Sequence, residues 1–207
     1  MKIHTDSVSK QLYEMLKEEI LSRHLLPGDK IGTREIAEQN NVSIMPVRDA
    51  LLQLTSDGLL QNRERVGFFV RRFTAEEIHE IIEVRSMFEL YCLQNHLSNR
   101  DDAVWLKIRE HLFAATSIQE LDRVDHELHR SIVYMSGNQI LVGEYNRLYS
   151  LFSIGMSSGE GSPYDLARKE HAEILACILR GDPDAACRAL KGHLERVCSE
   201  IVSLYRD

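Results

Sequence analysis

The stretch TREIAEQNNVSIMPVRDALLQLTSDGLL, residues 33–60, decides how the N-terminal part of the chain folds. It holds one short run with helical spacing at 33–39, a polar Asn-Asn turn, and a second helical run at 43–57 that ends at Gly58. Another helical pattern precedes it at residues 7–23. Three helices in this order, the last two joined by a short turn, are typical of a helix-turn-helix.

Two short apolar runs follow the third helix and predict a β-hairpin. Residues 59–62 and 68–71 have strand character, and the basic tip Arg63–Gly67 lies between them. A hairpin after a helix-turn-helix is the order of a winged helix-turn-helix, a DNA-binding fold. We therefore predict a DNA-binding domain over residues 1–73.

From residue 74 onward the sequence predicts helices alone. Thr74-Ala75-Glu76-Glu77 is a capping box that begins a long helix. Short breaks separate six helical patterns, at residues 75–98, 101–116, 119–136, 138–156, 163–181 and 183–205. Six helices with short loops favour an antiparallel bundle, so we expect a mostly α-helical protein whose second domain spans residues 74–207.

Composition limits the partners and the compartment. The formal net charge is −7, but residues 1–73 carry 11 Lys and Arg against 10 Asp and Glu, whereas the remainder carries 14 against 22. DNA binding is therefore expected only from the N-terminal part, through individually placed arginines. The first six residues are mostly polar, so we expect no signal peptide, and the sequence holds no apolar run long enough for a membrane helix. The four cysteines have no CxxC spacing, which argues against a disulfide or zinc framework. From these features together we expect a cytoplasmic protein without a membrane partner.

The start of a recognition helix faces base edges in the major groove. At the helix predicted over 43–57, these positions are Ser43, Ile44, Met45, Val47 and Arg48. Arg48 can contact guanine or phosphate, and Arg34 begins the preceding helix, where phosphate contacts are natural. Arg65 at the wing tip is placed to enter the minor groove or to contact the backbone.

These motifs resemble the winged-helix domain of the GntR family over residues 8–72. The resemblance rests on Pro27-Gly28-Asp29-Lys30, Thr33-Arg34-Glu35-Ile36-Ala37, Asn41-Val42-Ser43, Pro46-Val47-Arg48-Asp49-Ala50-Leu51 and Asp57-Gly58-Leu59-Leu60. It implies a homodimer that binds a palindromic double-stranded operator through Arg34, Ser43, Ile44, Arg48 and the wing at Arg65-Val66-Gly67. The family usually has arginine where this chain has Ile44, which can touch a thymine methyl but cannot bind guanine, so the operator sequence of relatives does not transfer.

Four polar residues fall on the apolar, inward faces of the C-terminal helices. Asp125 and His129 lie four residues apart on one face, and His171 and His193 each fall within the apolar stripe of a later helix. Burying three imidazoles and a carboxylate without a partner is costly, and a divalent cation satisfies all four. Such a set suits Zn, Ni, Mn, Fe or Co and leaves positions open for water or a ligand.

Other arrangements of these residues are less favourable. Asp122 and His126 are also four apart, but on a mostly charged face, so we expect His126 to be solvated. The run His126-Glu127-Leu128-His129 lacks the HExxH spacing of zinc hydrolases, and Glu170 is expected to point away from the site. We therefore expect a regulator and not an enzyme, with a metalloenzyme as the alternative.

The C-terminal pattern resembles the FCD ligand-binding domain of the FadR subgroup of GntR regulators, over residues 75–205. The resemblance rests on Asp125-x-x-Leu128-His129-x-x-Ile132, Glu170-His171-x-x-Ile174, His193 and Gly137-Asn138. It implies a helical bundle in which the aspartate and three histidines bind metal beside a small effector, often a carboxylate.

Two further residues are candidates for effector binding. Arg85 lies on the apolar face of the helix predicted over 75–98 and can either clamp an effector carboxylate or pair with Glu89 at i+4. Asn138 can reach the pocket or cap the next helix. Arg147 and Tyr149 are weaker candidates. We expect a ligand-responsive regulator, most simply a repressor, with the metal itself as the signal in the alternative.

Overall fold

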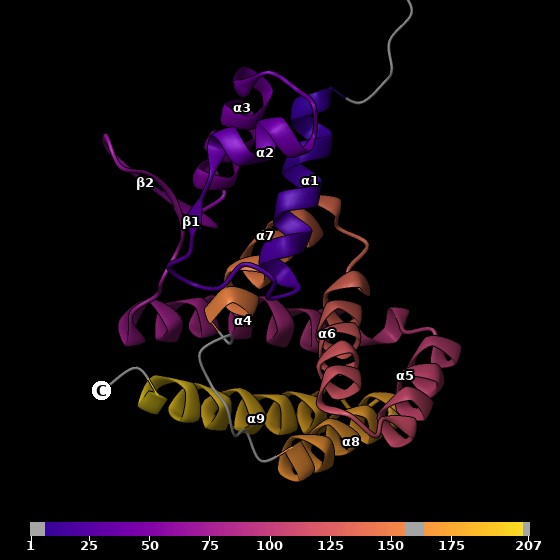
Figure 1. Ribbon diagram of the computed structural model, residues 1–207. Coiled ribbons are helices and arrows are strands. Elements are labelled where there is room, and N and C mark those ends of the chain that lie inside the picture. The colour runs from indigo at the N-terminus through magenta and orange to yellow at the C-terminus, as the bar shows by residue number, and fades with distance from the viewer. Residues whose placement is uncertain (1–6, 156–163, 205–207) are drawn as a thin grey trace, which may run out of the picture. The chain divides into compact units, whose positions relative to one another are not determined.

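The computed structural model of the protein describes residues 7–155 and 164–204, which form two compact units (Figure 1). The N-terminal unit comprises residues 7–73 and 150–155, and the helical unit comprises 74–149 and 164–204. Within these ranges no helix combines the length and the apolar character that crossing a membrane requires.

Three helices build the N-terminal unit in the predicted order: α1 (Val8–Leu21), α2 (Thr33–Gln39) and α3 (Ile44–Ser56). The first and third pack against each other, because each carries an apolar stripe at helical spacing. The stripes are buried and include Leu12, Leu16, Ile20, Val47, Leu51 and Leu54. This packing leaves the start of α3 exposed, as a recognition helix requires.

A small antiparallel sheet completes the N-terminal unit. The predicted hairpin is present as β2 (Leu60–Arg63) and β3 (Gly67–Val70), and a third strand, β1 (Lys30–Ile31), pairs with the other side of β3. The sequence did not predict β1, because two residues are too few to show the alternation of a strand. The sheet order is β1-β3-β2.

The helical unit contains the six predicted helices, with one short 3-10 turn after the first. Their bounds are α4 (Ala75–His96), η1 (Leu97–Asn99), α5 (Asp102–Ala114), α6 (Ile118–Tyr134), α7 (Gln139–Gly155), α8 (Tyr164–Arg180) and α9 (Pro183–Leu204). Helix α9 packs extensively against both α4 and α8, and α6 packs against α4, α5 and α8 (Figure 1). The core therefore receives side chains from α4, α6, α8 and α9, and the last three of these helices carry the predicted metal ligands.

One helix is shared between the two units. The part of α7 up to Tyr149 groups with the helical unit, whereas the residues from Ser150 group with the N-terminal unit. There Leu151 lies beside Gly58. The sequence pattern of α7 is continuously helical and does not indicate this change of surroundings.

The capping box at the start of α4 gives a test of the local folding argument. The Glu77 amide donates to Thr74 Oγ1 at 3.2 Å, and the Thr74 amide donates to Glu77 Oε2 at 2.9 Å. Thr74→Ala should lower the free energy of unfolding by about 1 kcal/mol, because an N-terminal amide of α4 loses its acceptor. Thr74→Ser keeps the acceptor and should be close to wild type in urea denaturation. Equal stabilities for the two variants would contradict this account.

Candidate metal centre

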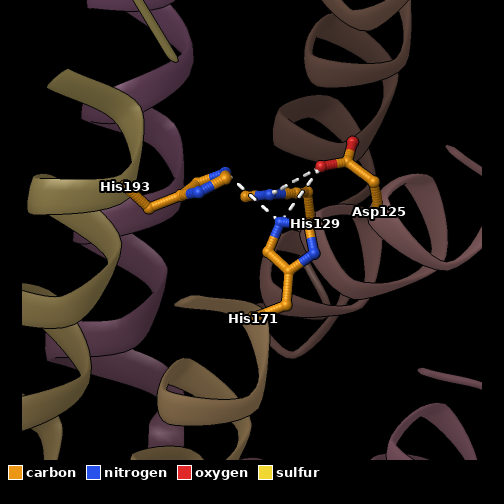
Figure 2. Close-up of side chains that lie close together, drawn as sticks. All are labelled: Asp125, His129, His171 and His193. Carbon is orange, nitrogen blue, oxygen red and sulfur yellow. Dashed lines mark hydrogen bonds and ion pairs between the residues drawn. The ribbon is translucent and has the colours of Figure 1, made fainter. Parts of the chain in front are cut away.

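Four polar side chains from three helices converge in the core of the helical unit (Figure 2). Asp125 and His129 lie one turn apart on α6, while His171 comes from α8 and His193 from α9. The three histidines are buried and Asp125 is half-buried. One possible ligand atom from each residue lies within 4.8 Å of all the others. The structure therefore brings together all four residues that the sequence analysis singled out.

Three of the distances within the cluster match those between ligands of one small cation. Asp125 Oδ1 lies 3.4 Å from His129 Nε2 and 3.2 Å from His171 Nε2. The Nε2 atoms of His171 and His193 are 3.3 Å apart. Ligand atoms about 2.1 Å from a tetrahedral ion lie about 3.4 Å from one another. An ion of the size of Zn²⁺ therefore fits between these atoms.

The hydrogen bonding of the imidazoles also fits a cation. His129 Nε2 is buried and accepts or donates no hydrogen bond within the described structure. The Nε2 atoms of His171 and His193 face each other, and two such nitrogens form a hydrogen bond only if one of them carries a proton. A cation bound to all three Nε2 lone pairs satisfies each of them at once.

Two glutamates orient the outer nitrogens of two of these rings. His129 Nδ1 donates to Glu89 Oε2 at 2.5 Å, and His193 Nδ1 donates to Glu170 Oε2 at 2.8 Å. Because ionised carboxylates only accept, each ring presents an Nδ1 proton to its glutamate, and Nε2 is the nitrogen that faces the centre. Carboxylate–histidine pairs of this kind are common around protein-bound metals.

The surroundings of the cluster keep Glu89 and Asp125 ionised and His193 neutral. Burial alone would raise the pKa of Glu89, but His129 and Arg85 outweigh it and lower that pKa to about 2. Burial alone would also raise the pKa of Asp125, but His129 outweighs burial and holds that pKa well below its usual value. Burial lowers the pKa of His193 to about 4. His193 is therefore neutral at physiological pH, as a metal ligand must be.

Arg85 lies beside this cluster on α4 and is buried. Its Nε donates to Glu89 Oε1 at 2.7 Å, so the i+4 pair considered from the sequence is present. Its guanidinium carbon lies 5.5 Å from the centre of the Tyr149 ring. Tyr149 in turn donates to Asp125 Oδ2 at 3.4 Å. Arg85 is therefore linked to His129 through Glu89 and to Asp125 through Tyr149.

The structure also shows the surroundings of two other polar residues considered in the sequence analysis, His126 and Asn138. His126 is half-buried and stacks on the Tyr149 ring with the centroids 4.1 Å apart, so the prediction that it is solvated was wrong. Its face of α6 is covered because α7 packs a tyrosine there. Asn138 is exposed, and its side chain accepts from the amides of Ile140 and Leu141 in the first turn of α7. It caps that helix, and its assignment to effector binding stays a prediction.

Sequence reasoning missed several residues that surround the ligands: Glu89, Tyr145, Glu170 and Arg196. Glu89 was considered only as a partner for Arg85, although it also contacts His129. Glu170 was expected to point away from the site, but it binds His193 on the adjacent helix. Arg196 holds Glu170 with two hydrogen bonds of 2.6 Å. The i+3 spacing of His193 and Arg196 was the available signal, since one acidic group can bind both.

The residues predicted to contact DNA lie on the N-terminal unit. Ser43 immediately precedes α3, and Ile44, Met45 and Arg48 are exposed on its first two turns. Val47, which was also expected to face DNA, is buried in the core of the unit, so that expectation was wrong. Arg34 is exposed at the start of α2. At the wing tip, Arg65 has φ 61° and Gly67 has φ 122°, values that shape the tight turn between β2 and β3. Their contacts with DNA stay predictions.

Comparison with known proteins identifies both parts of the chain. The model of the gntR family of bacterial regulatory proteins matches residues 8–70, and the model of the FCD domain matches residues 80–196. The transcriptional repressor RspR of Escherichia coli K12 is 23% identical over 98% of this chain and 92% of its own length. A probable D-xylose utilization operon repressor of Paenarthrobacter nicotinovorans is 27% identical over 91% of this chain and 86% of its own.

Solved structures extend the similarity. A GntR transcriptional regulator of Rhodococcus sp. RHA1 has the same fold, with a TM-score of 0.88 at 19% identity over 97% of this chain and 100% of that one. The Zn²⁺-bound FCD domain of the transcriptional regulator TM0439 is 25% identical, with a TM-score of 0.58 over 64% of this chain and 96% of that one. The present chain therefore belongs to the GntR family, as a transcriptional regulator that joins a helix-turn-helix DNA-binding domain to an FCD domain.

Proposed function

We propose that this regulator is a cytoplasmic repressor that binds a palindromic operator as a homodimer and senses a small carboxylate at a bound metal ion. The observation that carries the proposal is the convergence of Asp125, His129, His171 and His193 in the core of the helical unit. Relatives described as repressors and a relative with a Zn²⁺-bound FCD domain support it.

The donor set defines the class of metal. Three imidazole nitrogens and one carboxylate oxygen suit Zn, Ni, Mn or Fe, whereas Mg and Ca prefer sites made of oxygen alone. When bound, the ion would supply a Lewis acid that can take an oxygen ligand by expanding from four to five coordination. We assign the four protein positions to Asp125 Oδ1 and to the Nε2 atoms of the three histidines, because these atoms face one another.

The charge balance around the site favours an anionic effector. A divalent ion and Arg85 together exceed the Asp125 and Glu89 carboxylates by one positive charge, whereas the partly exposed Glu170 and Glu200 share Arg196. A buried excess of positive charge attracts a small anion. In this proposal the effector carboxylate binds the ion and lies toward Arg85, whose planar guanidinium suits a carboxylate.

The exposure of the candidate residues on the N-terminal unit supports the proposed DNA contacts. Arg34 suits phosphate, and Arg48 suits phosphate or guanine. Ile44 and Met45 offer apolar contacts such as that to a thymine methyl, and the wing reaches the backbone or the minor groove through Arg65. Two copies of this surface in a homodimer would read the two half-sites of a palindrome.

Metal binding can be tested with one histidine. His171→Ala should remove the high-affinity Zn²⁺ site, because it deletes a ligand that no neighbour replaces. For the wild type, Zn²⁺ at 100 times its Kd should raise the free energy of unfolding by about 2.7 kcal/mol, and a chelator should reverse the effect. His79→Ala, at an exposed position on α4, is the matched control. Zn²⁺ binding by His171→Ala with wild-type affinity would contradict the assignment.

DNA binding can be tested by fluorescence anisotropy on the DNA upstream of the regulator's own gene. Arg48→Ala should weaken operator binding by about 1–3 kcal/mol, because it removes a predicted base or phosphate contact. Arg109→Ala, on the exposed face of α5, should bind like the wild type. The proposal fails if the wild type shows no sequence-specific binding under any metal or metabolite condition.

The same assay separates the two signals considered for this site. Small carboxylates added to the Zn²⁺-loaded protein should change operator affinity at a constant metal concentration. If affinity instead follows Zn²⁺ with no organic ligand present, the metal itself is the signal and metabolite sensing is excluded as the regulatory input.

A further inference from the structure

The Glu89 carboxylate is the most enclosed charged group near the candidate metal centre, with no exposed surface. Its two oxygens have different partners. Oε1 accepts from Arg85 Nε at 2.7 Å and from the Tyr145 hydroxyl at 2.6 Å. Oε2 accepts from His129 Nδ1 at 2.5 Å. Three donors on three helices therefore hold this carboxylate in one orientation.

We propose that Glu89 is a positioning residue for the metal centre, which fixes the proton of His129 on Nδ1 and so directs the Nε2 lone pair at the ion. This inference rests on the proposed metal binding described above. The pairing of Glu89 with Arg85 does not account for the contact with His129. Oε1 alone accepts the hydrogen bonds of Arg85 and Tyr145, whereas Oε2 contacts His129.

The choice of tautomer matters because a neutral imidazole has only one lone pair for a metal. If the proton moved to Nε2, it would occupy the side of His129 that faces Asp125 Oδ1, 3.4 Å away. A carboxylate at Nδ1 prevents this, since it accepts a hydrogen bond and cannot donate one when ionised. It also makes the ring a stronger donor of electron density to the ion.

Glu170 makes the same type of contact with His193, but its surroundings differ. The Glu170 side chain is 20% exposed and is held from one side by Arg196, whereas the Glu89 side chain is 0% exposed. Water can therefore exchange with Glu170 as a partner for His193 but cannot replace Glu89 at His129. We expect the loss of Glu89 to be the more damaging of the two.

Glu89→Gln tests the proposal with almost no change in shape. If the amide oxygen stays with Arg85 and Tyr145, the NH₂ group faces His129 Nδ1 and forces the ring proton onto Nε2. Zn²⁺ affinity of the full chain, measured by competition with a coloured chelator, should fall by about tenfold to hundredfold. Glu83→Gln, the same substitution at an exposed position of α4, should bind Zn²⁺ like the wild type.

A second readout follows the proton directly. Nitrogen-15 NMR of the metal-free wild type, in alkaline buffer where the rings are neutral, should show the His129 proton on Nδ1. The same spectrum of Glu89→Gln should show it on Nε2, and Glu170→Gln should leave the His129 signals as in the wild type. A merely structural role for Glu89 would lower stability without moving this proton.

The outcomes separate this inference from the function on which it rests. Wild-type Zn²⁺ affinity together with an unchanged Nδ1 proton in Glu89→Gln would overturn the role of Glu89. If Glu89→Gln does not fold, the wild-type spectrum still tests the role of Glu89. A His129 proton on Nε2 would overturn that role, and a proton on Nδ1 would support it. If the wild type binds no metal, the proposed function fails, whereas the NMR experiment still decides whether Glu89 fixes the tautomer.

Discussion

Three imidazoles and a carboxylate can lie side by side in a helical core only if other groups offset the loss of their hydration. In this protein Asp125, His129, His171 and His193 meet that condition through their surroundings. Glu89 and Glu170 accept the outer protons of two rings, and Arg85 and Arg196 balance these carboxylates in turn. A cation at the centre would complete the arrangement. These groups come from α4, α6, α8 and α9, so the balance depends on the packing of these four helices around one another.

Helical periodicity made much of the molecule predictable. The order of helices and strands in the N-terminal unit followed from short apolar runs, turn residues and Gly58, and the six later helices followed from their breaks. The four clustered residues could be found because a polar group within an apolar stripe must face the core, whichever helices it meets there. The capping box at Thr74 was likewise confirmed, since it depends on local sequence alone.

What the sequence could not predict depends on which helices are neighbours. The contact of Glu170 with His193 needs α8 beside α9, and the stacking of His126 on Tyr149 needs α7 beside α6. Glu89 has an obvious partner four residues earlier on its own helix, and this local pair concealed its second partner on α6. The grouping of the last turns of α7 with the N-terminal unit is also tertiary in origin. In each case the residue type indicated a polar contact, but the sequence could not identify the partner.

The central claim is that one transition-metal ion is held by Asp125 and the three buried histidines. Crystallography of the purified protein, with anomalous scattering data collected on both sides of the absorption edge of the metal, tests it most directly. The account predicts one strong anomalous peak bonded to Asp125 Oδ1 and to Nε2 of His129, His171 and His193. A metal-loaded crystal with no peak at these atoms, or with the metal bound elsewhere, would contradict it.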